Sequence, residues 1–261
     1  MYATNFFEDY MLNLLRGQNI PAQANMYLAL FLSNPSDTGT AGTEISYSGY
    51  ARQKITFTTP TPSGSGMMMQ NSATISFPES PVAISSPVSY VGVYDSSSIG
   101  TGNMWLYGQL DTPLTVQAGV SPVFREGNVK WIWSGNLTTY YRTAIMNTLR
   151  NTACSGFTPY IAFCNGDPTT TGSEFSGNNY ARVPVTMTVP AQQSSGTDLT
   201  QNESEVISSI STGSWGTLTH VALCDNSTGG NYFAVQSTTS YTTPSGTAIG
   251  YHAGTLQFNV N

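Results

Sequence analysis

The sequence YLALFLSNP at residues 27–35 leads into a polar loop rich in Gly, Ser and Thr and then into GYAR at residues 49–52. The same order returns as YIAFCNGDP at residues 160–168, a second polar loop and NYAR at residues 179–182. The first tyrosines of the two copies are 160 − 27 = 133 residues apart, and the second tyrosines 180 − 50 = 130. A unit of roughly 130 residues has therefore been used twice.

The similarity extends to both sides of this motif. Before it, MLNLLRG at residues 11–17 matches IMNTLRN at 145–151, and after it VGVYD at 91–95 matches VALCD at 221–225. We therefore expect two tandem domains, residues 1–136 and 137–261, each with its own core. The linker between them, Ser134-Gly135-Asn136, is too short to let two domains move independently.

A short helix is predicted at the start of each repeat. The first runs from a cap at Thr4 or Asn5 to a stop at Gly17, and the second from Thr138 or Thr139 to Asn151. In both, apolar side chains follow the helical period. A helix of about three turns is not stable alone, so each is expected to pack its apolar face on a sheet or on a neighbouring subunit.

Short strands separated by turn signals make up the rest of each repeat. They are predicted at residues 26–32, from 50 onward, 73–77, 88–94, 104–107, 116–120 and 128–133, and at 160–164, 182–189, 206–210, 218–224, 232–236 and 255–260. Pro60, Pro62 and a Gly/Ser group predict a loop before residue 73. Because no βαβ alternation is present, the fold class is mainly β, with two tandem antiparallel β-sandwich or jelly-roll-like domains, each preceded by one short α-helix.

The composition restricts the partners. Only 8% of the residues are charged, against about 25% in an ordinary soluble domain. A surface of neutral polar side chains and Tyr tolerates burial in a protein assembly, although an adhesin could share it. The net charge is −6 and no run of Lys or Arg is present, which argues against nucleic acid as a partner. Apolar runs are too short for a bilayer, and the N-terminus does not resemble a signal peptide, so we expect a soluble protein without a membrane partner.

Few residues suggest chemistry. Asp95 and Asp225 recur after equivalent strands and before small polar residues, where an Asp side chain closes a turn by accepting bonds from backbone amides. A calcium ligand is the alternative, but no neighbouring acid supports it. His220 and His252 have no counterparts in the first repeat and no nucleophile motif accompanies them, so we expect strand histidines facing solvent or a subunit contact.

Three cysteines lie in the second repeat, without metal-binding spacing. Cys164 and Cys224 fall in strand patterns, where the first repeat is expected to carry Leu32 and Tyr94. They are predicted to be small buried apolar side chains, with a cross-strand disulfide as the alternative. We therefore expect no catalytic, cofactor-binding or metal-binding residues, and no cofactor.

The Tyr-Ala-Arg motif is the most specific feature of the repeats. We expect the arginines of Tyr50-Ala51-Arg52 and Tyr180-Ala181-Arg182 to lie against an aromatic face, or to bond the carbonyls of the preceding loop at a sheet edge. Contact with a neighbouring subunit is the alternative.

Together, the capped helix, YLALF with its Asn-Pro or Asp-Pro turn, the loop with one Glu, GYAR and the later strand with an Asp resemble a family of tailed-phage structural proteins often labelled phage tail fibre proteins. The family's acidic position falls on Glu44 and Glu174, and its GYAR position on Tyr50 with Arg52 and on Tyr180 with Arg182. The second repeat departs from the pattern with NYAR and with Cys at apolar strand positions. The resemblance covers nearly the whole chain, as two copies where the usual member has one.

This resemblance implies a non-enzymatic virion component, made in the host bacterial cytoplasm. Its partners would be other virion proteins, either the major capsid protein or tail and fibre proteins. Because the chain shows no coiled-coil, collagen-like or β-helix period for a shaft, the leading hypothesis is a capsid decoration (cement) protein, with a subunit of a tail or head fibre as the alternative. A homo-oligomer is expected, with a trimer as the first guess because such proteins commonly have threefold symmetry.

A different class of function is a tail-tip adhesin that binds host surface glycan. Such a protein would use exposed aromatic platforms, for which the candidates are Trp105, Trp131, Trp133 and Trp215. Tryptophans in strands more often belong to the core, which weighs against this hypothesis. An enzyme such as a capsule depolymerase is disfavoured because no pair of catalytic acids is present.

Overall fold

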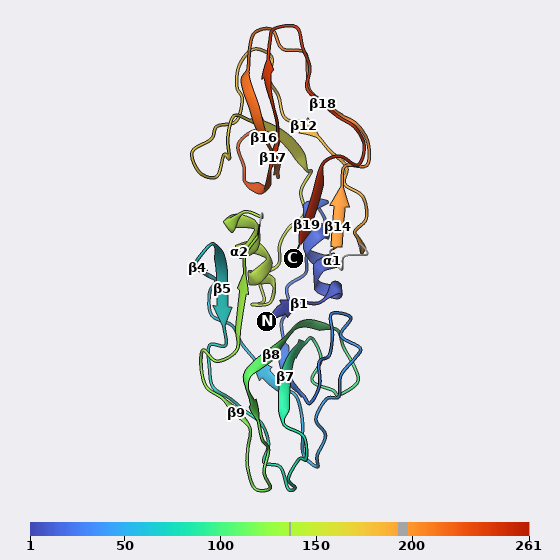
Figure 1. Ribbon diagram of the computed structural model, residues 1–261, viewed down its shortest axis with the longest axis vertical. Helices are drawn as coiled ribbons and strands as arrows, with labels where there is room; N and C mark the ends of the chain where they lie inside the picture. Colours follow the sequence, from blue (N-terminus) through green and yellow to red (C-terminus); the bar gives the residue numbers. More distant parts are fainter. Residues whose placement is uncertain (136, 193–197, 261) are drawn as a thin grey trace. The chain divides into compact units, whose positions relative to one another are not determined.

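The structure is a computed structural model that describes residues 1–135, 137–192 and 198–260 (Figure 1). The chain divides into two compact units. Unit 1 comprises Met1–Tyr10, Pro21–Trp133 and Met146–Ala153, and unit 2 comprises Met11–Ile20, Ser134–Ile145 and Cys154–Asn261. Each unit thus includes a segment of the other sequence repeat. The domain boundary expected after Asn136 falls outside the described residues and stays a prediction.

Unit 1 holds one large and two small antiparallel sheets. The orders are β1-β8-β7-β2-β3, β10-β5-β4 and β6-β9. The elements are β1 (Tyr2–Ala3), α1 (Asn5–Leu15, shared with unit 2), β2 (Met26–Phe31), β3 (Gln53–Ile55), β4 (Thr61–Ser63), β5 (Gly66–Gln70), β6 (Ile75–Ser76), β7 (Val88–Tyr94), β8 (Met104–Leu114), β9 (Val123–Phe124) and β10 (Lys130–Trp133).

Unit 2 repeats this arrangement with sheets β12-β11-β16-β17, β13-β14-β19 and β15-β18. Its elements are α2 (Thr139–Thr148, shared with unit 1), β11 (Tyr160–Cys164), β12 (Val183–Pro184), β13 (Ala191–Gln192), β14 (Asp198–Gln201), β15 (Val206–Ile207), β16 (Gly216–Cys224), β17 (Tyr232–Thr243), β18 (Gly250–Tyr251) and β19 (Gln257–Val260). The registers agree, since Tyr27 pairs with Tyr94 and Tyr160 with Cys224. The predicted mainly β fold, with antiparallel sheets and one short helix leading each repeat, is confirmed.

Each helix is fixed by a threonine cap that also bonds to a strand. Thr4 Oγ1 donates to Met104 O at 2.6 Å and lies 3.4 Å from Phe7 N, whereas Thr138 Oγ1 donates to Tyr232 O at 2.7 Å and accepts from Tyr141 N at 3.1 Å. The sequence left two candidates for each helix cap, and the structure shows that the caps are Thr4 and Thr138. Because the same hydroxyl satisfies a helix end and a strand carbonyl, the cap also sets where each helix meets its sheet.

Aromatic side chains join the first turns of the helices to the cores. In unit 1 the ring of Phe7 lies 5.0 Å from Trp105 of β8 and 5.6 Å from Trp131 of β10. In unit 2 the ring of Tyr141 lies 5.9 Å from Phe233 of β17. The expectation that each helix buries its apolar face on strands is confirmed, because these side chains are nearly inaccessible to solvent.

The segments that follow the helices make their contacts with the opposite repeat. In unit 1, Arg150 Nε donates to Phe57 O at 3.2 Å. In unit 2, Arg16 Nε donates to Met187 O at 3.2 Å, and Ile20 exchanges backbone hydrogen bonds with Cys154. Since Arg16 and Arg150 lie in the turns just after matching helices, the exchange is reciprocal.

Two predictions about strands were wrong. The loop expected before residue 73 contains the hairpin β4–β5, in which Gly64 turns the chain with φ of 58°. Met67 and Met69 of this hairpin are buried and pair with the tryptophans of β10, so burial outweighs the turn signals around them. Residues 116–120 form no strand, and Val120 makes only an isolated bridge to Ser80.

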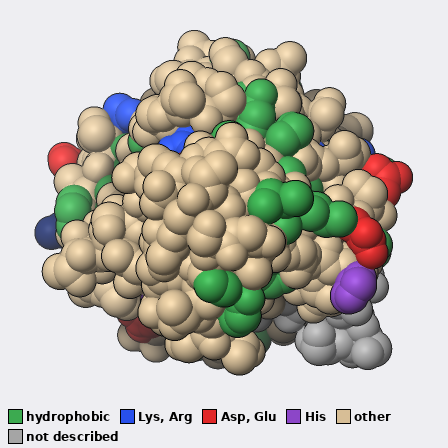
Figure 2. Space-filling model, turned by 90° about the horizontal axis from the view of Figure 1, so that it is seen from above, with side chains coloured by type: hydrophobic (Ala, Val, Ile, Leu, Met, Phe, Trp, Pro, Cys, Tyr) green, Lys and Arg blue, Asp and Glu red, His purple; other side chains and the backbone are tan. Residues whose placement is uncertain are grey.

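The exposed surface is mostly uncharged, as its composition predicts. Figure 2 shows a face on which charged side chains are few and scattered among neutral groups. Among the described residues, no helix is long and apolar enough to cross a membrane.

Candidate functional site

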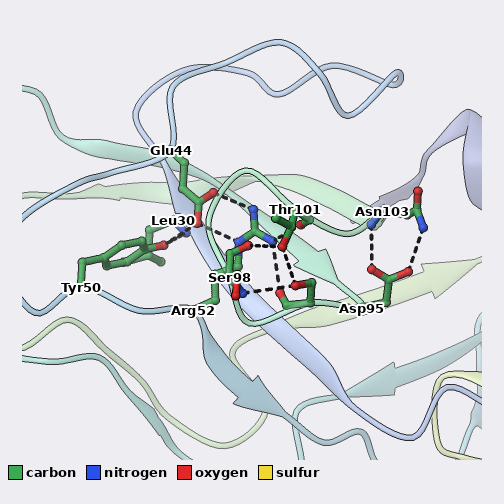
Figure 3. A network of polar contacts seen from close by, with 9 residues as sticks. Leu30, Glu44, Tyr50, Arg52, Asp95, Ser98, Thr101 and Asn103 are labelled. Atoms are coloured by element: carbon green, nitrogen blue, oxygen red, sulfur yellow. Dashed lines mark hydrogen bonds and ion pairs between the residues drawn. The ribbon is translucent and has the colours of Figure 1, made fainter.

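The repeated Tyr-Ala-Arg motif of the first repeat assembles around the guanidinium of Arg52. Its Nε donates to Glu44 Oε1 at 2.9 Å and its Nη2 to Glu44 Oε2 at 2.8 Å, so the ion pair is bidentate (Figure 3). Nη1 donates to the carbonyls of Ser96 at 3.1 Å and Thr101 at 2.9 Å. The carbon at the centre of the guanidinium lies 3.6 Å from the ring centroid of Tyr94. Planar Arg is the side chain that satisfies all these contacts at once.

These contacts decide between the alternatives for the motif. The arginine does lie on an aromatic face and does bond loop carbonyls, as expected. The carbonyls belong to the loop after β7, however, while the preceding loop supplies Glu44 instead. Because Arg52 is only 4% exposed, it is not available to a neighbouring subunit.

The tyrosine of the motif connects the ion pair to strand β2. Tyr50 Oη donates to Glu44 Oε1 at 3.1 Å and accepts from Leu30 N at 3.0 Å. Its ring stacks on Phe77, with centroids 5.9 Å apart. Burial, together with the Glu44 charge, raises the pKa of the phenol far above its ordinary value, so the hydroxyl stays protonated and keeps donating.

Asp95 fixes the loop that supplies the two carbonyls. Its carboxylate accepts from Asn103 N at 2.7 Å, from Asn103 Nδ2 at 3.0 Å and from Trp105 Nε1 at 3.2 Å. Asp225 closes the equivalent turn by accepting from Asn231 N at 2.7 Å. The predicted turn-closing role of both aspartates is confirmed. Among the described residues, no group of three or more Asp, Glu, His or Cys side chains is arranged to hold a metal ion.

The second repeat builds the same network. Arg182 binds Glu174 through Nε at 2.8 Å and Nη2 at 2.6 Å, and its Nη1 donates to the carbonyls of Asn226 at 2.7 Å and Gly229 at 2.6 Å. Tyr180 Oη donates to Glu174 Oε1 at 2.9 Å. The replacement of GYAR by NYAR leaves the network intact, because Asn179 adopts a φ of 65°, in the left-handed region that glycine and asparagine both tolerate.

One aromatic partner has moved between the repeats. Cys224 replaces Tyr94 beside the arginine, and the ring comes instead from Tyr232, whose centroid is 5.4 Å from the Arg182 guanidinium. Tyr232 Oη also donates to Glu174 Oε2 at 2.8 Å. Burial opposes ionisation of Glu174, but the hydrogen bonds from Arg182, Tyr232 and Tyr180 outweigh it and hold the pKa of this carboxyl below its ordinary value.

A family model for the podophage GP4 fiber I protein gp80 matches the chain over residues 2–132 and 136–259. The chain belongs to this gp80 family. The two matched segments follow the two sequence repeats, which agrees with a tandem duplication. A search of curated proteins finds no match to the chain. The family relation establishes a bacteriophage structural protein of a fibre family, and the resemblance expected from the motifs is confirmed.

Within this gp80-family chain, the exchange of Tyr94 for Cys224 belongs to a larger set. In unit 1, Phe31, Tyr94 and Met104 pack together with Ala29. In unit 2, the same cluster holds Cys164 and Cys224, and Ala222 stands where the first repeat has a glycine.

The glycine is Gly92, and the larger side chains of unit 1 explain it. A Cβ at this position would lie 2.7 Å from Met104 Sδ and 3.1 Å from ring atoms of both Phe31 and Tyr94. The register also shows that Cys164 corresponds to Phe31, because both lie at the strand end that pairs with the acidic residue of the loop. The assignment to Leu32 was therefore wrong by one residue.

In the gp80-family chain, two of the cysteines lie in the core, whereas both histidines are at least partly exposed to solvent. Cys164 and Cys224 are buried free thiols, as predicted, and burial raises the pKa of Cys164 to about 12. They are not cross-strand partners, since Cys164 pairs with His220 and Cys224 with Tyr160. His220 lies half-buried in β16, whereas His252 follows β18 and its Nδ1 lies 2.9 Å from Glu205 Oε1 at the surface.

The tryptophans proposed as glycan platforms are core residues. Trp105, Trp131, Trp133 and Trp215 are all buried, so the favoured interpretation of core residues is confirmed and the alternative of exposed aromatic platforms is wrong. Trp105 of β8 and Trp131 of β10 pack on Phe7 of the first helix, and Trp133 stacks on Trp131. Trp215 lies just before β16, where its Nε1 donates to Asn178 O at 2.9 Å.

A repeated asparagine also organises each unit, although the sequence does not single it out. Asn71 Nδ2 donates to the carbonyls of Ala73 and Arg125, and its Oδ1 accepts from Val129 N. Asn202 makes the matching bonds to Ser204, His252 and Leu256. The only sequence signal is the pair QN at 70–71 and 201–202, which is too short to stand out without the strands around it.

Proposed function

We propose that the chain is a non-enzymatic structural subunit of a podophage fibre. The observation that carries this proposal is the family match. It covers both repeats and nearly the whole chain, and the description of the matching family names a fiber protein. The partners would be other fibre or tail proteins of the virion, together with further copies of the chain.

The networks around the arginines support a structural role. The repeated acids are neutralised by bidentate arginines or occupied by backbone amides. A catalytic acid needs a proton that it can exchange with substrate in a cleft, whereas Glu44 and Glu174 hold a loop, a strand and an arginine together. The ion pairs and hydrogen bonds of these acids therefore hold loops in place on a surface with few charges.

Capsid decoration is the second candidate, and a specific observation favours it. Both units are compact, and the longest helix of the described residues has 11 residues. Compact units of this kind suit a protein that covers a shell, since the described residues include no long helix that could form an extended shaft.

Labelling of intact particles would test the proposal. Antibodies against the purified chain, detected with gold by electron microscopy, should label fibres or the tail region of virions. Preadsorption of the antibody with the purified chain serves as the control. Label spread evenly over the head would contradict the fibre proposal and support decoration.

A further inference from the structure

Strand β17 forms an open edge of the four-stranded sheet in unit 2. It pairs with β16 on one side and with no named strand on the other (Figure 1). The segment before α2 bridges it at one point, where Leu137 pairs with Ala234. Among the described residues, nothing outside the ladder with β16 hydrogen-bonds to the backbone of residues 236–243. The outer side of this half of the strand therefore presents unpaired amides and carbonyls.

The side chains along this edge are uncharged hydroxyl groups. Residues 237–243 read STTSYTT, a run in which every side chain carries a hydroxyl. Ser237 and residues 239–242 are exposed, and Tyr241 retains 46% of its accessible surface. The whole of β17 contains neither a charged residue nor a proline. Because a hydroxyl both donates and accepts, this edge offers hydrogen bonds and no charge to repel an approaching strand.

The corresponding edge of unit 1 is protected. Leu106 of β8 holds the register position of Ala234, and here β1 adds a strand that pairs with Leu106 and Tyr107. Farther along β8, the exposed Asp111 adds a charge and the exposed Pro113 lacks a backbone amide. Charges and prolines are the usual means of keeping an edge strand from pairing with another chain.

A register shift interrupts the two ladders at the same point, so it does not distinguish the edges. It falls between Val88 and Tyr90 in unit 1 and between Leu218 and His220 in unit 2. The difference between the units therefore lies in the added strand, the charge and the proline. All three are present on β8, and β17 has neither the charge nor the proline.

The run of hydroxyls is complementary to itself. When two identical strands pair antiparallel about a twofold axis, any register within residues 237–243 places a hydroxyl side chain opposite another. Such cross-strand pairs of Ser and Thr stabilise a sheet, whereas like charges placed opposite each other destabilise it. A strand from a different protein is selected through pockets or charges beside the edge, and β17 supplies no charge.

From these observations we propose that residues 236–243 of β17 pair antiparallel with the same residues of a second copy of the chain. The two sheets of unit 2 then become one continuous sheet across the pair. This contact is isologous and gives a dimer, in place of the trimer expected first from the sequence.

The inference rests on the proposed function only for its place in the virion, where it names the surface that joins copies of the chain. Association is measured on the purified chain, whereas gold labelling of particles tests the position of the chain. Either proposal can therefore fail while the other stands.

Sedimentation velocity over a series of concentrations provides the test. The full chain should show a monomer–dimer equilibrium. The variant Thr239→Lys/Tyr241→Lys should weaken the dimer at least about ten-fold, because it places four ammonium groups along the paired strands. The matched control Gln109→Lys/Thr112→Lys adds the same charges at exposed positions of β8 and should leave the dimer unchanged.

A charge-reversed variant guards against misfolding as the cause of lost association. Thr239→Glu/Tyr241→Glu should also be monomeric, but a mixture of the lysine and glutamate variants should form a heterodimer, because opposite charges then face each other. Each variant alone should keep the thermal unfolding curve of the dilute unsubstituted chain. A folded mixture that does not associate would overturn the pairing.

Hydrogen exchange locates the contact. As the concentration rises, amides in residues 236–243 should gain protection, while those in residues 109–114 of β8 should not. A trimer, protection confined to another segment, or a lysine variant that associates like the unsubstituted chain would contradict the proposal. A monomer at every concentration would also overturn it and leave the edge to a strand of another protein.

Discussion

At the scale of single residues, the arginine of the Tyr-Ala-Arg motif holds each repeat together through a buried ion pair. The Glu44 and Arg52 side chains are 10% and 2% exposed. A pair at this depth gives little net stability over an apolar replacement, but removing one partner leaves the other charge buried and uncompensated. The motif therefore stabilises the fold only when both the arginine and the glutamate are present.

Replacement of Arg52 by alanine tests this directly. We expect Arg52→Ala to lower the free energy of unfolding by about 3–5 kcal/mol, because Glu44 and two carbonyls lose their donor. Urea unfolding at neutral pH measures the change. Lys54→Ala, at an exposed neighbouring position, is the control and should stay within about 0.5 kcal/mol of the unsubstituted chain. Equal unfolding midpoints for both variants would contradict the role of Arg52.

Glu174 makes stability dependent on pH in a defined direction. Its folded-state pKa is depressed below the ordinary value of 4.5, so the stability that it contributes is fully present above about pH 4.5 and is lost as pH falls through the folded-state pKa. The melting temperature should therefore fall over this acid range, and Glu174→Gln should show a smaller fall. Calorimetry at a series of pH values measures both, and parallel curves would contradict the prediction.

Gly92 tests the coordinated exchange of side chains between the repeats. Gly92→Ala should cost about 1–3 kcal/mol, since the new methyl group meets Met104, Phe31 and Tyr94. In a chain that also carries Phe31→Cys and Tyr94→Cys, as in the second repeat, the added cost of Gly92→Ala should shrink. A double-mutant cycle by chemical denaturation measures this coupling. Additive costs would show that the exchange is not coordinated.

Some of these residue contacts could be predicted from sequence, and others could not. The pairing of Arg52 with an aromatic face followed from the motif, and Glu44 was recognised as the acidic position of the family. Nothing in the spacing showed that the two form one ion pair, because the contact joins residues eight positions apart across an irregular loop. The relocation of the aromatic ring to Tyr232 was equally hidden, since it depends on strand register.

At the scale of elements, the helices depend on caps that reach into the sheets. Thr138→Ala should lower the free energy of unfolding by about 1–2 kcal/mol, because Tyr141 N and the strand carbonyl of Tyr232 both lose their partner. Thr139→Ala, at the next and exposed position, is the control and should be nearly neutral. Thermal unfolding by circular dichroism measures both, and equal effects would argue against Thr138 as the cap.

Periodicity predicted some elements well and failed for others. Strands β2, β7 and β11 and both helices lie close to their expected places, because long apolar patterns fixed them. The hairpin β4–β5 was missed because Pro62 and a Gly/Ser group resemble a loop, yet the proline sits on an edge strand, where a missing amide is tolerated. Strands β6, β9 and β18 have only two residues each, which is too few to show a periodic pattern, and they are defined by their hydrogen-bonded partner strands.

At the scale of the whole molecule, duplication explains both the likeness and the difference of the two units. Each unit keeps the same arginine network and the same strand order within its sheets, except that β1 of the large sheet in unit 1 has no counterpart among the named strands of unit 2. The segments after the helices are exchanged between the repeats. The repeat itself was evident from the sequence. The exchange was not, because a periodic pattern shows which residues are alike and not which of them touch. With the shared framework preserved, the second repeat could diverge at its outer side chains.

The central claim is that this gp80-family chain serves as a structural subunit of a fibre. The number of copies per virion tests it most directly, because fibres are few on a particle whereas shell coverings follow the many subunits of the capsid. Quantitative mass spectrometry of purified virions, with the major capsid protein as internal reference, measures this number. We predict a few to a few dozen copies per particle, and hundreds of copies would contradict the claim and make the chain a decoration protein of the shell.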